Sequence, residues 1–327
     1  MSAYPSHWKQ ALESLPSTPE KIPSFFFAHG SPMLAFPASG AGSAGGMMAY
    51  HGPNGPLAKF LADFGPILLK KYKPKGIVVF SAHWETKGEL TDYAENPLLM
   101  DYYGFPPELY KLKFKSRGDS KLAARVVDLY KEVKSGFAFC NAVLLTQRIF
   151  QAGLKAKTTS VTESRGEDGR GFEGPGLDHG VFVPFRLMFG EEFTEIPIIQ
   201  VSLDSSLDPK TNWEAGRAVA KLREEGILIL SGGLTAHNLG DRTSFAPDTA
   251  RAVHKEFDRA IHTAFAVEPA EERKKALFAL PKHPGFRASQ PREDHFVGLY
   301  VADGAGEGGE VKTIVDLYGL ASFAFGI

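Results

Sequence analysis

Short apolar runs rich in β-branched and aromatic residues alternate with longer segments of helical period, and this alternation constrains the fold most strongly. It is typical of an α/β fold in which helices flank a largely parallel central sheet. The near-continuous hydrophobicity of the runs indicates strands that are buried on both faces. The predicted strands are residues 24–28, 76–81, 196–203 and 227–231, with closing strands at 313–317 and 322–325.

Helical spacing of apolar residues separates these strands, and it predicts helices over residues 57–68, 122–133, 213–225 and 248–265. On the last helix, His254, Asp258 and His262 share one face, which we interpret as the partly solvated flank of an apolar stripe rather than a metal site.

Loops are predicted at residues 37–56 and 158–175. The first contains His51, which we do not assign to a functional site. No linker tract or repeat interrupts the chain. We therefore expect one catalytic domain over residues 1–327, with residues 1–23 as an N-terminal extension.

Charge and cysteine content exclude several classes of protein. Lys and Arg number 37 against 38 Asp and Glu, without a long basic run, so nucleic acid is not an expected partner. The one cysteine, Cys140, lies among apolar residues and cannot form an internal disulfide, which indicates a reducing compartment. The sequence has neither an apolar signal segment nor a membrane-spanning run, so we expect a cytoplasmic protein that does not enter membranes. Nothing indicates an obligate protein partner.

Three histidines follow apolar strand patterns. His29 and His83 each come directly after a predicted strand, and His237 follows the strand at 227–231 through a glycine turn. In open α/β sheets, ligands bind outside the carboxyl ends of the strands, so these side chains can converge there. One such histidine is usually a hydrogen-bonded structural residue. Three equivalent placements instead predict a metal site, because neutral imidazole is the commonest metal ligand.

Two further histidines lie at the starts of other segments. Asp178 and His179 open an apolar segment, and His295 lies near a predicted helix start after Pro291. Taken singly, each is explained equally well as a structural residue.

The motifs together resemble the class III extradiol ring-cleavage dioxygenases, the LigB-like superfamily, and are most similar to their DOPA 4,5-dioxygenase branch. The resemblance spans residue 25 to the C-terminus in the expected order, and residues 101–106 resemble that branch's loop near the substrate. The motifs that carry it are His-Gly-Ser-Pro at 29–32, Ser-Ala-His-Trp at 81–84, Leu-Asp-His-Gly at 177–180, Gln-Val-Ser-Leu-Asp-Ser-Ser at 200–206, Ser-Gly-Gly-Leu-Thr-Ala-His-Asn-Leu at 231–239 and Glu-Asp-His-Phe at 293–296.

The resemblance implies that His29, His83 and His295 bind a metal, with His237 and His179 beside it as acid–base residues. We expect His237 to be the base, and leave open that it is itself a ligand, especially if zinc replaces iron. His179 is expected to position oxygen or deliver a proton, oriented by Asp178 or another carboxylate. The family's typical third ligand is Glu, whereas the DOPA-like branch has His.

Because the third ligand departs from the family's typical Glu, the ligand set stays open. Either Glu293 or Asp294 is then expected to hydrogen-bond to a ligand rather than bind the metal. Fe(II) is expected for activity, and Zn(II) can occupy the purified form.

Ring cleavage requires this kind of site. A catechol chelates Fe(II) through two oxygens while O₂ takes a remaining position, so three protein ligands on one face suit the reaction. We therefore predict a dioxygenase acting on DOPA or another small phenolic. Two alternatives remain: a zinc-dependent hydrolase or amidase using the same histidines, and a non-catalytic binding module of the same fold.

Overall fold

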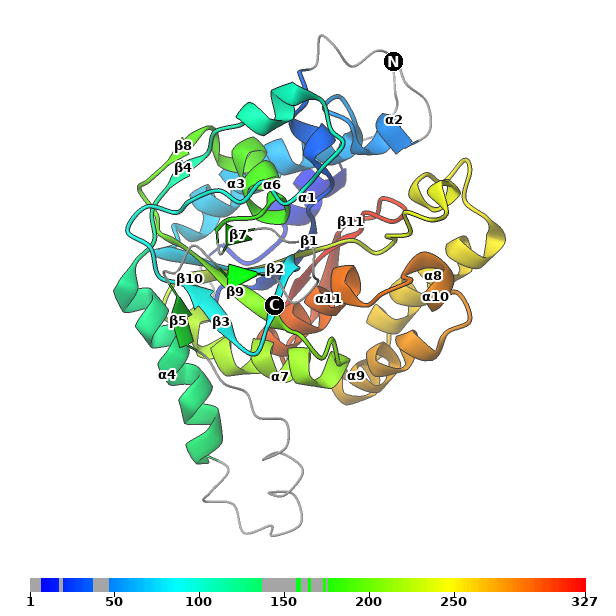
Figure 1. Cartoon of the computed structure of the whole chain (residues 1–327). Coiled ribbons are helices and arrows are strands. Elements are labelled where there is room, and N and C mark those ends of the chain that lie inside the picture. Colours follow the sequence, from blue (N-terminus) through cyan, green and yellow to red (C-terminus); the bar gives the residue numbers. More distant parts are fainter. Residues whose placement is uncertain are drawn as a thin grey trace.

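An eight-stranded sheet lies at the centre of the computed structural model, which describes residues 7–17, 20–37, 47–136, 157–159, 164–165, 173–174 and 176–327 (Figure 1). Its strand order is β11-β12-β1-β10-β2-β9-β3-β5. The bounds are β1 Ser24–Ala28, β2 Gly76–Thr86, β3 Glu89–Thr91, β5 Lys157–Thr159, β9 Ile198–Asp204, β10 Ile227–Gly233, β11 Val311–Val315 and β12 Ser322–Phe325. Two small sheets pair β4 (Lys115–Ser116) with β8 (Glu192–Phe193), and β6 (Ser164–Arg165) with β7 (Glu173–Gly174).

The four central strands β1, β10, β2 and β9 pair in parallel, so their carboxyl ends share one edge of the sheet. Strands β11 and β12 join antiparallel beside β1, and β3 pairs antiparallel with β9. The predicted fold class is therefore confirmed: the chain forms a single α/β domain with a mostly parallel sheet. Burial of each central strand accounts for the lack of polar alternation in its sequence.

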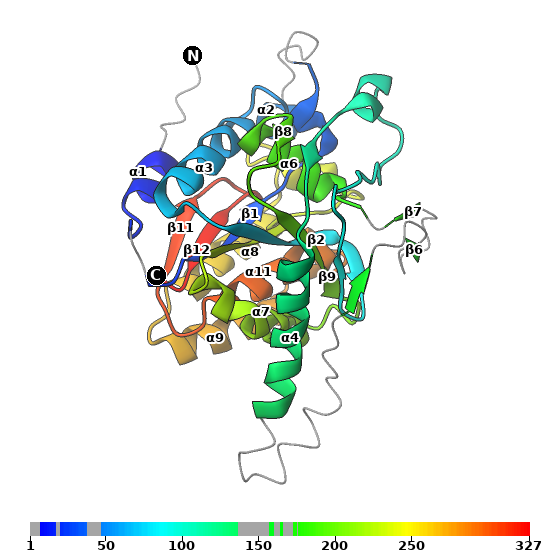
Figure 2. The ribbon, with the colours of Figure 1, turned by 90° about the vertical axis from the view of Figure 1, so that its left-hand side faces the viewer.

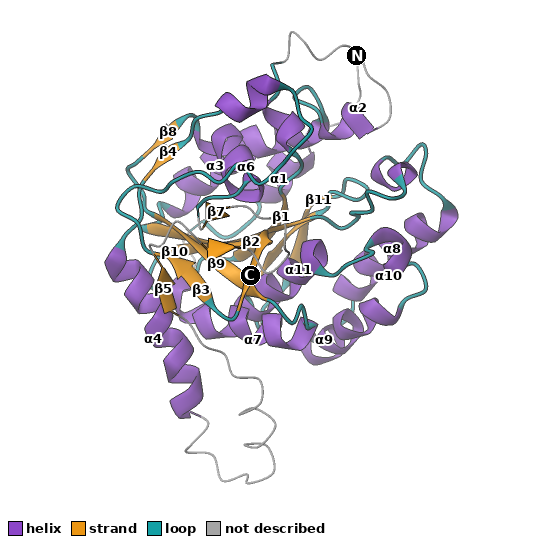
Figure 3. Cartoon of the chain, in the orientation of Figure 1, coloured by secondary structure: helices purple, strands orange, loops and turns teal. Residues whose placement is uncertain are grey.

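Helices cover both faces of the sheet (Figures 2 and 3). One apolar layer includes residues of α1, α3 and α6, and the other includes residues of α4, α7, α8 and α11. The α-helices are α1 His7–Glu13, α2 Met47–His51, α3 Pro56–Tyr72, α4 Ser120–Gly136, α6 His179–Phe189, α7 Pro209–Val219, α8 Ala252–Phe265, α9 Ala270–Ala279, α10 Phe286–Ser289 and α11 Asp294–Ala305. The 3-10 helices are η1 Pro32–Ala35, η2 Pro107–Lys111, η4 Ala220–Arg223, η5 Arg242–Phe245 and η6 Leu280–Lys282.

The largest difference from the predicted strands concerns β2, which continues to Thr86 instead of ending at Ser81. Its pairing with β9 is irregular between Ser81 and Glu85, so His83 lies inside a bulged strand rather than after one. A bulge redirects side chains locally, which is how a histidine within a strand can face the carboxyl edge of the sheet.

Two predicted helix starts were displaced. Helix α7 begins at Pro209 instead of 213, because Asp208 caps it by accepting a hydrogen bond from the Thr211 N–H. Helix α8 begins at Ala252 instead of 248, since residues 246–250 form a separate turn in which the Ala250 N–H donates to the Ala246 carbonyl.

Three other predictions concern loops and single residues. The predicted loop at 37–56 was wrong in part, because α2 lies within it. His254 is buried at 1% exposure, so its placement on a solvated flank was also wrong. Cys140 and most of the predicted loop at 158–175 lie outside the described residues.

Candidate metal centre

Five histidines from separate parts of the chain meet at the carboxyl edge of the central strands. His29 directly follows β1, His83 lies in β2, and His237 follows β10; His179 and His295 occupy the first turns of α6 and α11. His29 and His295 are buried and the other three are half-buried. The ring centroids of His29, His83 and His295 are 4.8 to 5.2 Å apart. All five histidines singled out in the sequence are thus brought together.

Glycines allow this close approach. A Cβ atom on Gly233 would lie 2.3 Å from the His295 carbonyl oxygen, so only glycine lets the end of β10 pass beside the start of α11. A Cβ atom on Gly180 would lie 3.0 Å from Nδ1 of His83, which leaves that ring little room for any larger residue. The two glycines therefore set how tightly these histidines can cluster.

His29 presents an unpaired ring nitrogen to the cluster. Its Nδ1 lies 2.7 Å from the Gly30 carbonyl oxygen, which can only accept, so Nδ1 carries the hydrogen. Nε2 consequently has a free lone pair, and it is buried without a hydrogen-bond partner among the described residues. Burial, followed by the neighbouring imidazoles, holds the pKa of His29 well below its ordinary value. A neutral ring with a free buried acceptor is what a metal ligand requires.

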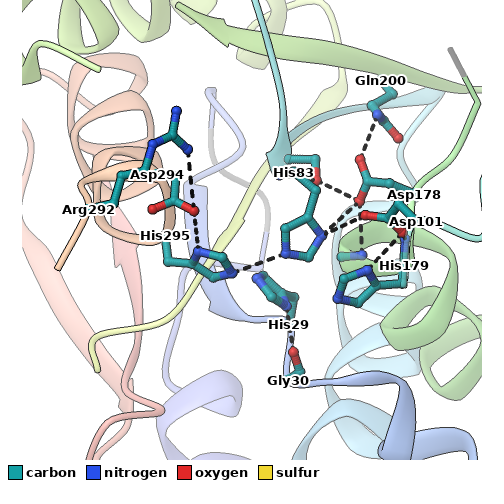
Figure 4. Close-up of polar contacts among 12 residues, drawn as sticks. His29, Gly30, His83, Asp101, Asp178, His179, Gln200, Arg292, Asp294 and His295 are labelled. Atoms are coloured by element: carbon teal, nitrogen blue, oxygen red, sulfur yellow. Dashed lines mark hydrogen bonds and ion pairs between the residues drawn. The ribbon is translucent and has the colours of Figure 1, made fainter. Parts of the chain in front are cut away.

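The rings of His295 and His83 face one another through their Nε2 atoms (Figure 4). Nδ1–H of His295 donates to Oδ2 of Asp294 at 2.8 Å, which turns Nε2 toward Nε2 of His83 at 3.0 Å. Nδ1 of His83 lies 3.4 Å from carboxylate oxygens of both Asp101 and Asp178. Burial alone would lower the pKa of His83, but Asp178 and Asp101 reverse the shift and raise it. Since Nδ1 of neutral His295 carries the hydrogen, its Nε2 accepts and Nε2–H of His83 donates; a metal ion bound between these two atoms would displace that hydrogen.

The ligand atoms of His29, His83 and His295 all lie within 4.8 Å of one another. Three imidazole nitrogens, one of them orphaned in a buried position, fit a borderline divalent cation such as Fe(II) or Zn(II). His237 falls in a second group of potential ligands with Asp294 and His295, and His179 in a third with His83 and Asp101.

His179 and His237 each stack on a different one of the three central rings. The ring of His179 stacks on His83 with centroids 3.9 Å apart, and the ring of His237 stacks on His295 at 3.5 Å. Burial lowers the pKa of His179, and burial together with the His295 ring lowers that of His237 further. Both imidazoles are therefore neutral near pH 7 and able to accept a proton.

Carboxylates fix the orientation of these rings. The carboxylate that contacts His179 is Asp101 rather than Asp178, the one residue named for this role from the sequence. Oδ1 of Asp101 accepts hydrogen bonds from the backbone N–H and Nδ1–H of His179, at 2.9 and 2.8 Å. Asp178 instead caps α6 and accepts hydrogen bonds from Ser81 and Gln200. Asp101 thus orients His179, a contact between distant segments that carries no local sequence signal.

An ion pair missed in the sequence stands beside His295. Arg292 donates to both carboxylate oxygens of the buried Glu85, and its Nη1 lies 3.7 Å from Oδ2 of Asp294. Of the two acidic residues considered as supports, Asp294 contacts His295, whereas Glu293 pairs with Arg287. Arg292 therefore links the β2 strand that carries His83 to the helix that carries His295.

The fold and the site define a metal-binding α/β enzyme whose histidine cluster lies at the carboxyl edge of its parallel strands. The family model of the catalytic LigB subunit of aromatic ring-opening dioxygenase matches residues 24–325. A Schizosaccharomyces pombe protein, 4,5-DOPA dioxygenase extradiol-like protein, is 40% identical over 98% of this chain and 97% of its own length. The 4,5-DOPA dioxygenase extradiol of Beta vulgaris is 31% identical over 89% of this chain and 90% of its own length.

The chain belongs to the LigB family of aromatic ring-opening dioxygenases. The predicted family and the predicted class of enzyme are confirmed. A solved structure of an uncharacterized Escherichia coli K12 protein shares the fold with a TM-score of 0.59 at 22% identity, covering 94% of this chain and all of that one. Within the described part of the chain, no helix combines the length and apolar character needed to cross a membrane.

His51, which the sequence interpretation left out, contacts the edge of the site. Its buried ring meets Phe245 edge-on at 5.6 Å, and Phe245 in turn meets His237 at 6.1 Å. Burial lowers the pKa of His51 to about 4, against a weaker opposing hydrogen bond to the Phe245 backbone. Between about pH 6.5 and pH 4, His51 is therefore protonated in the unfolded chain but not in the folded one. The free energy of unfolding falls as the pH drops through this range.

We predict that His51→Gln reduces this acid sensitivity. Between pH 7.5 and pH 5, the metal-free wild type should lose about 2 kcal/mol more unfolding free energy than the variant. Urea unfolding at both pH values in the presence of a chelator measures the difference. His262→Gln is the matched control, because burial lowers the pKa of His262 but Asp316 raises it overall, so its loss should act in the opposite direction. Parallel stability curves for wild type and His51→Gln would contradict the prediction.

Proposed function

We propose that this enzyme opens the ring of a catechol between an extradiol pair of carbons, using O₂ and one Fe(II) held by Nε2 of His29, His83 and His295. The observation that carries the proposal is the convergence of these three imidazoles around the unpaired, buried Nε2 of His29. Three ligands from one side would leave coordination positions for both substrates.

Bound iron would supply the centre at which an electron-rich diphenol and O₂ react. The chain's own residues would manage the protons. His237, neutral through burial and stacked on His295, would accept a proton from a catechol hydroxyl. His179, neutral at the outset, would take up a second proton released as the catechol binds and return it later, because the Asp101 carboxylate behind its Nδ1 stabilises the imidazolium form that this uptake creates. We keep open that His237 binds a zinc ion directly when zinc replaces iron.

We propose DOPA or a similar small phenolic as the substrate, which the names of the relatives from Schizosaccharomyces pombe and Beta vulgaris support. The product would be a ring-opened muconic semialdehyde. We further propose that residues 1–327 act as one catalytic domain in the cytoplasm, without nucleic acid, membrane or obligate protein partners. Residues 1–23 would be an extension; within it, Trp8 of α1 packs edge-on against Phe60 of α3 at 6.1 Å.

Anaerobic reconstitution tests this proposal. We expect protein loaded with one equivalent of Fe(II), mixed with DOPA and then O₂, to consume one O₂ per ring and to form a yellow product. Zinc-loaded protein should show no turnover of the catechol. Hydrolysis of esters or amides by the zinc form, without O₂ uptake by the iron form, would instead establish a zinc hydrolase. Failure to bind either metal, with no thermal stabilisation by either, would indicate a binding module.

A further inference from the structure

Asp241, His254 and Ser289 form a polar chain behind the segment that carries His237. His254, on α8, places Nδ1 3.1 Å from Oγ of Ser289 and Nε2 3.2 Å from Oδ2 of Asp241. A carboxylate only accepts hydrogen bonds, so Nε2–H donates to Asp241, and in the neutral ring Nδ1 then accepts from the Ser289 hydroxyl. Arg251 pairs with the same carboxylate at 2.6 Å. One imidazole therefore ties the end of α10 to the loop after β10.

These residue types also occur in hydrolytic triads, but the geometry argues against that use. Ser289 and His254 are each 1% exposed, so a substrate carbonyl cannot reach the hydroxyl. The hydroxyl also meets Nδ1 of the histidine while the carboxylate meets Nε2, the reverse of the usual triad arrangement. The buried contacts instead suit a structural role, in which they fix the backbone around Ser289.

That backbone holds the loop carrying His237. The carbonyl oxygen of Ser289 accepts the His237 N–H at 2.8 Å, and the carbonyl oxygen of Ala288 accepts from the Asn238 side chain at 2.7 Å. Asp241, at the far end of the same loop, is the residue that His254 contacts directly. His254 thus contacts both Ser289, whose carbonyl holds the His237 N–H, and Asp241, where the same loop ends. The neighbouring positions of α8 and α10 permit these contacts (Figure 1).

We propose that His254, acting with Ser289 and Asp241, is a positioning residue that fixes the His237 backbone and hence the orientation of its ring against His295. This inference rests on the base role of His237 under the proposed function. A base on a loop needs such support, because loops hold a side chain less precisely than helices or strands do, and catalysis tolerates only small displacements. The 3.5 Å stacking of His237 on His295 is the geometry that the polar chain would preserve.

Ser289→Ala is the primary variant, since it removes only the hydroxyl. His254→Gln breaks the contact at Nδ1, whereas His254→Asn places an amide near the Nδ1 position and should restore part of the wild-type behaviour. His262→Gln, on the same helix, is the control. In metal-free protein, we expect hydrogen exchange at the His237 amide to become at least tenfold faster in Ser289→Ala and His254→Gln, and to stay unchanged in the control.

Activity adds a second, independent readout. In the Fe(II) enzyme, Ser289→Ala should lower kcat about tenfold at unchanged KM and metal content, consistent with a small displacement of a catalytic group. In a His237→Gln background, the same substitution should cause no further loss, because the residue through which it acts is already gone.

Unchanged exchange at His237, or an equal loss of activity in the His237→Gln background, would overturn the positioning role. Should the wild type fail to cleave any catechol, the proposed function would fall, and the exchange result alone would decide whether His254 holds His237.

Discussion

Replacement of His29 by glutamine is expected to abolish stoichiometric Fe(II) binding and to reduce kcat/KM for ring cleavage on the order of 10³-fold or more, because metal-ion catalysis supplies several kcal/mol. The wild-type ring has Nδ1 fixed on the Gly30 carbonyl and Nε2 buried without a partner, so its orientation is set before metal binds. Glutamine has no ring nitrogen to offer and would leave its amide poorly matched in the same buried space.

Metal content after gel filtration and steady-state O₂ uptake measure this effect. His262→Gln is the control, since that residue lies on α8 and pairs with the exposed Asp316. A His29→Gln enzyme that retains one tightly bound Fe(II) would show that the ligand set is different, and His237 would then be the first residue to examine.

Replacement of His237 by glutamine is expected to leave Fe(II) stoichiometry near one and to lower kcat by about 10²- to 10⁴-fold, the usual contribution of a general base. The expectation follows from geometry, because the His237 ring lies face to face with His295 rather than within the group formed by His29, His83 and His295. The lowered pKa of the half-buried His237 ring keeps it neutral at pH 7, ready to accept a proton.

Parallel measurements of bound iron and single-turnover kinetics separate a base from a ligand. Loss of iron in His237→Gln, at a level comparable to His29→Gln, would contradict the base assignment and favour direct coordination. Retained iron with unimpaired turnover would remove His237 from the proton chemistry altogether. His179→Gln provides a comparison at the ring that stacks on His83, where the Asp101 contact supports the imidazole.

The strand pattern was sufficient to locate most of the site. The predicted strand at 24–28 and the closing strand at 322–325 have the bounds seen in the structure, because both are short, apolar and buried. His29 and His237 followed from position alone, since parallel strands deliver their carboxyl ends to one edge. His83 was found for a partly wrong reason, because β2 continues past it through an irregularity that depends on pairing with β9.

The residues that orient the site were harder to predict from the sequence. Asp178 or another carboxylate was expected to orient His179; Asp178 instead caps α6 and contacts Ser81, and the carboxylate that holds His179 is Asp101, 78 positions away. His254 was assigned to the partly solvated flank of an apolar stripe, yet it is buried against Ser289. In each case a polar residue's role depends on which distant segment it meets, and hydrophobic period carries no information about that.

The sequence by itself determined the alternation of core strands and helices, the family and the five histidines, because hydrophobic period and short motifs are local properties of the chain. Only the tertiary structure decided which carboxylate orients which ring, that His29 keeps Nε2 free, and that the Ser289 carbonyl accepts the His237 N–H while His254 contacts the Ser289 hydroxyl. Hydrogen bonds are directional and act over about 3 Å, so they are fixed only once packing has brought distant segments together.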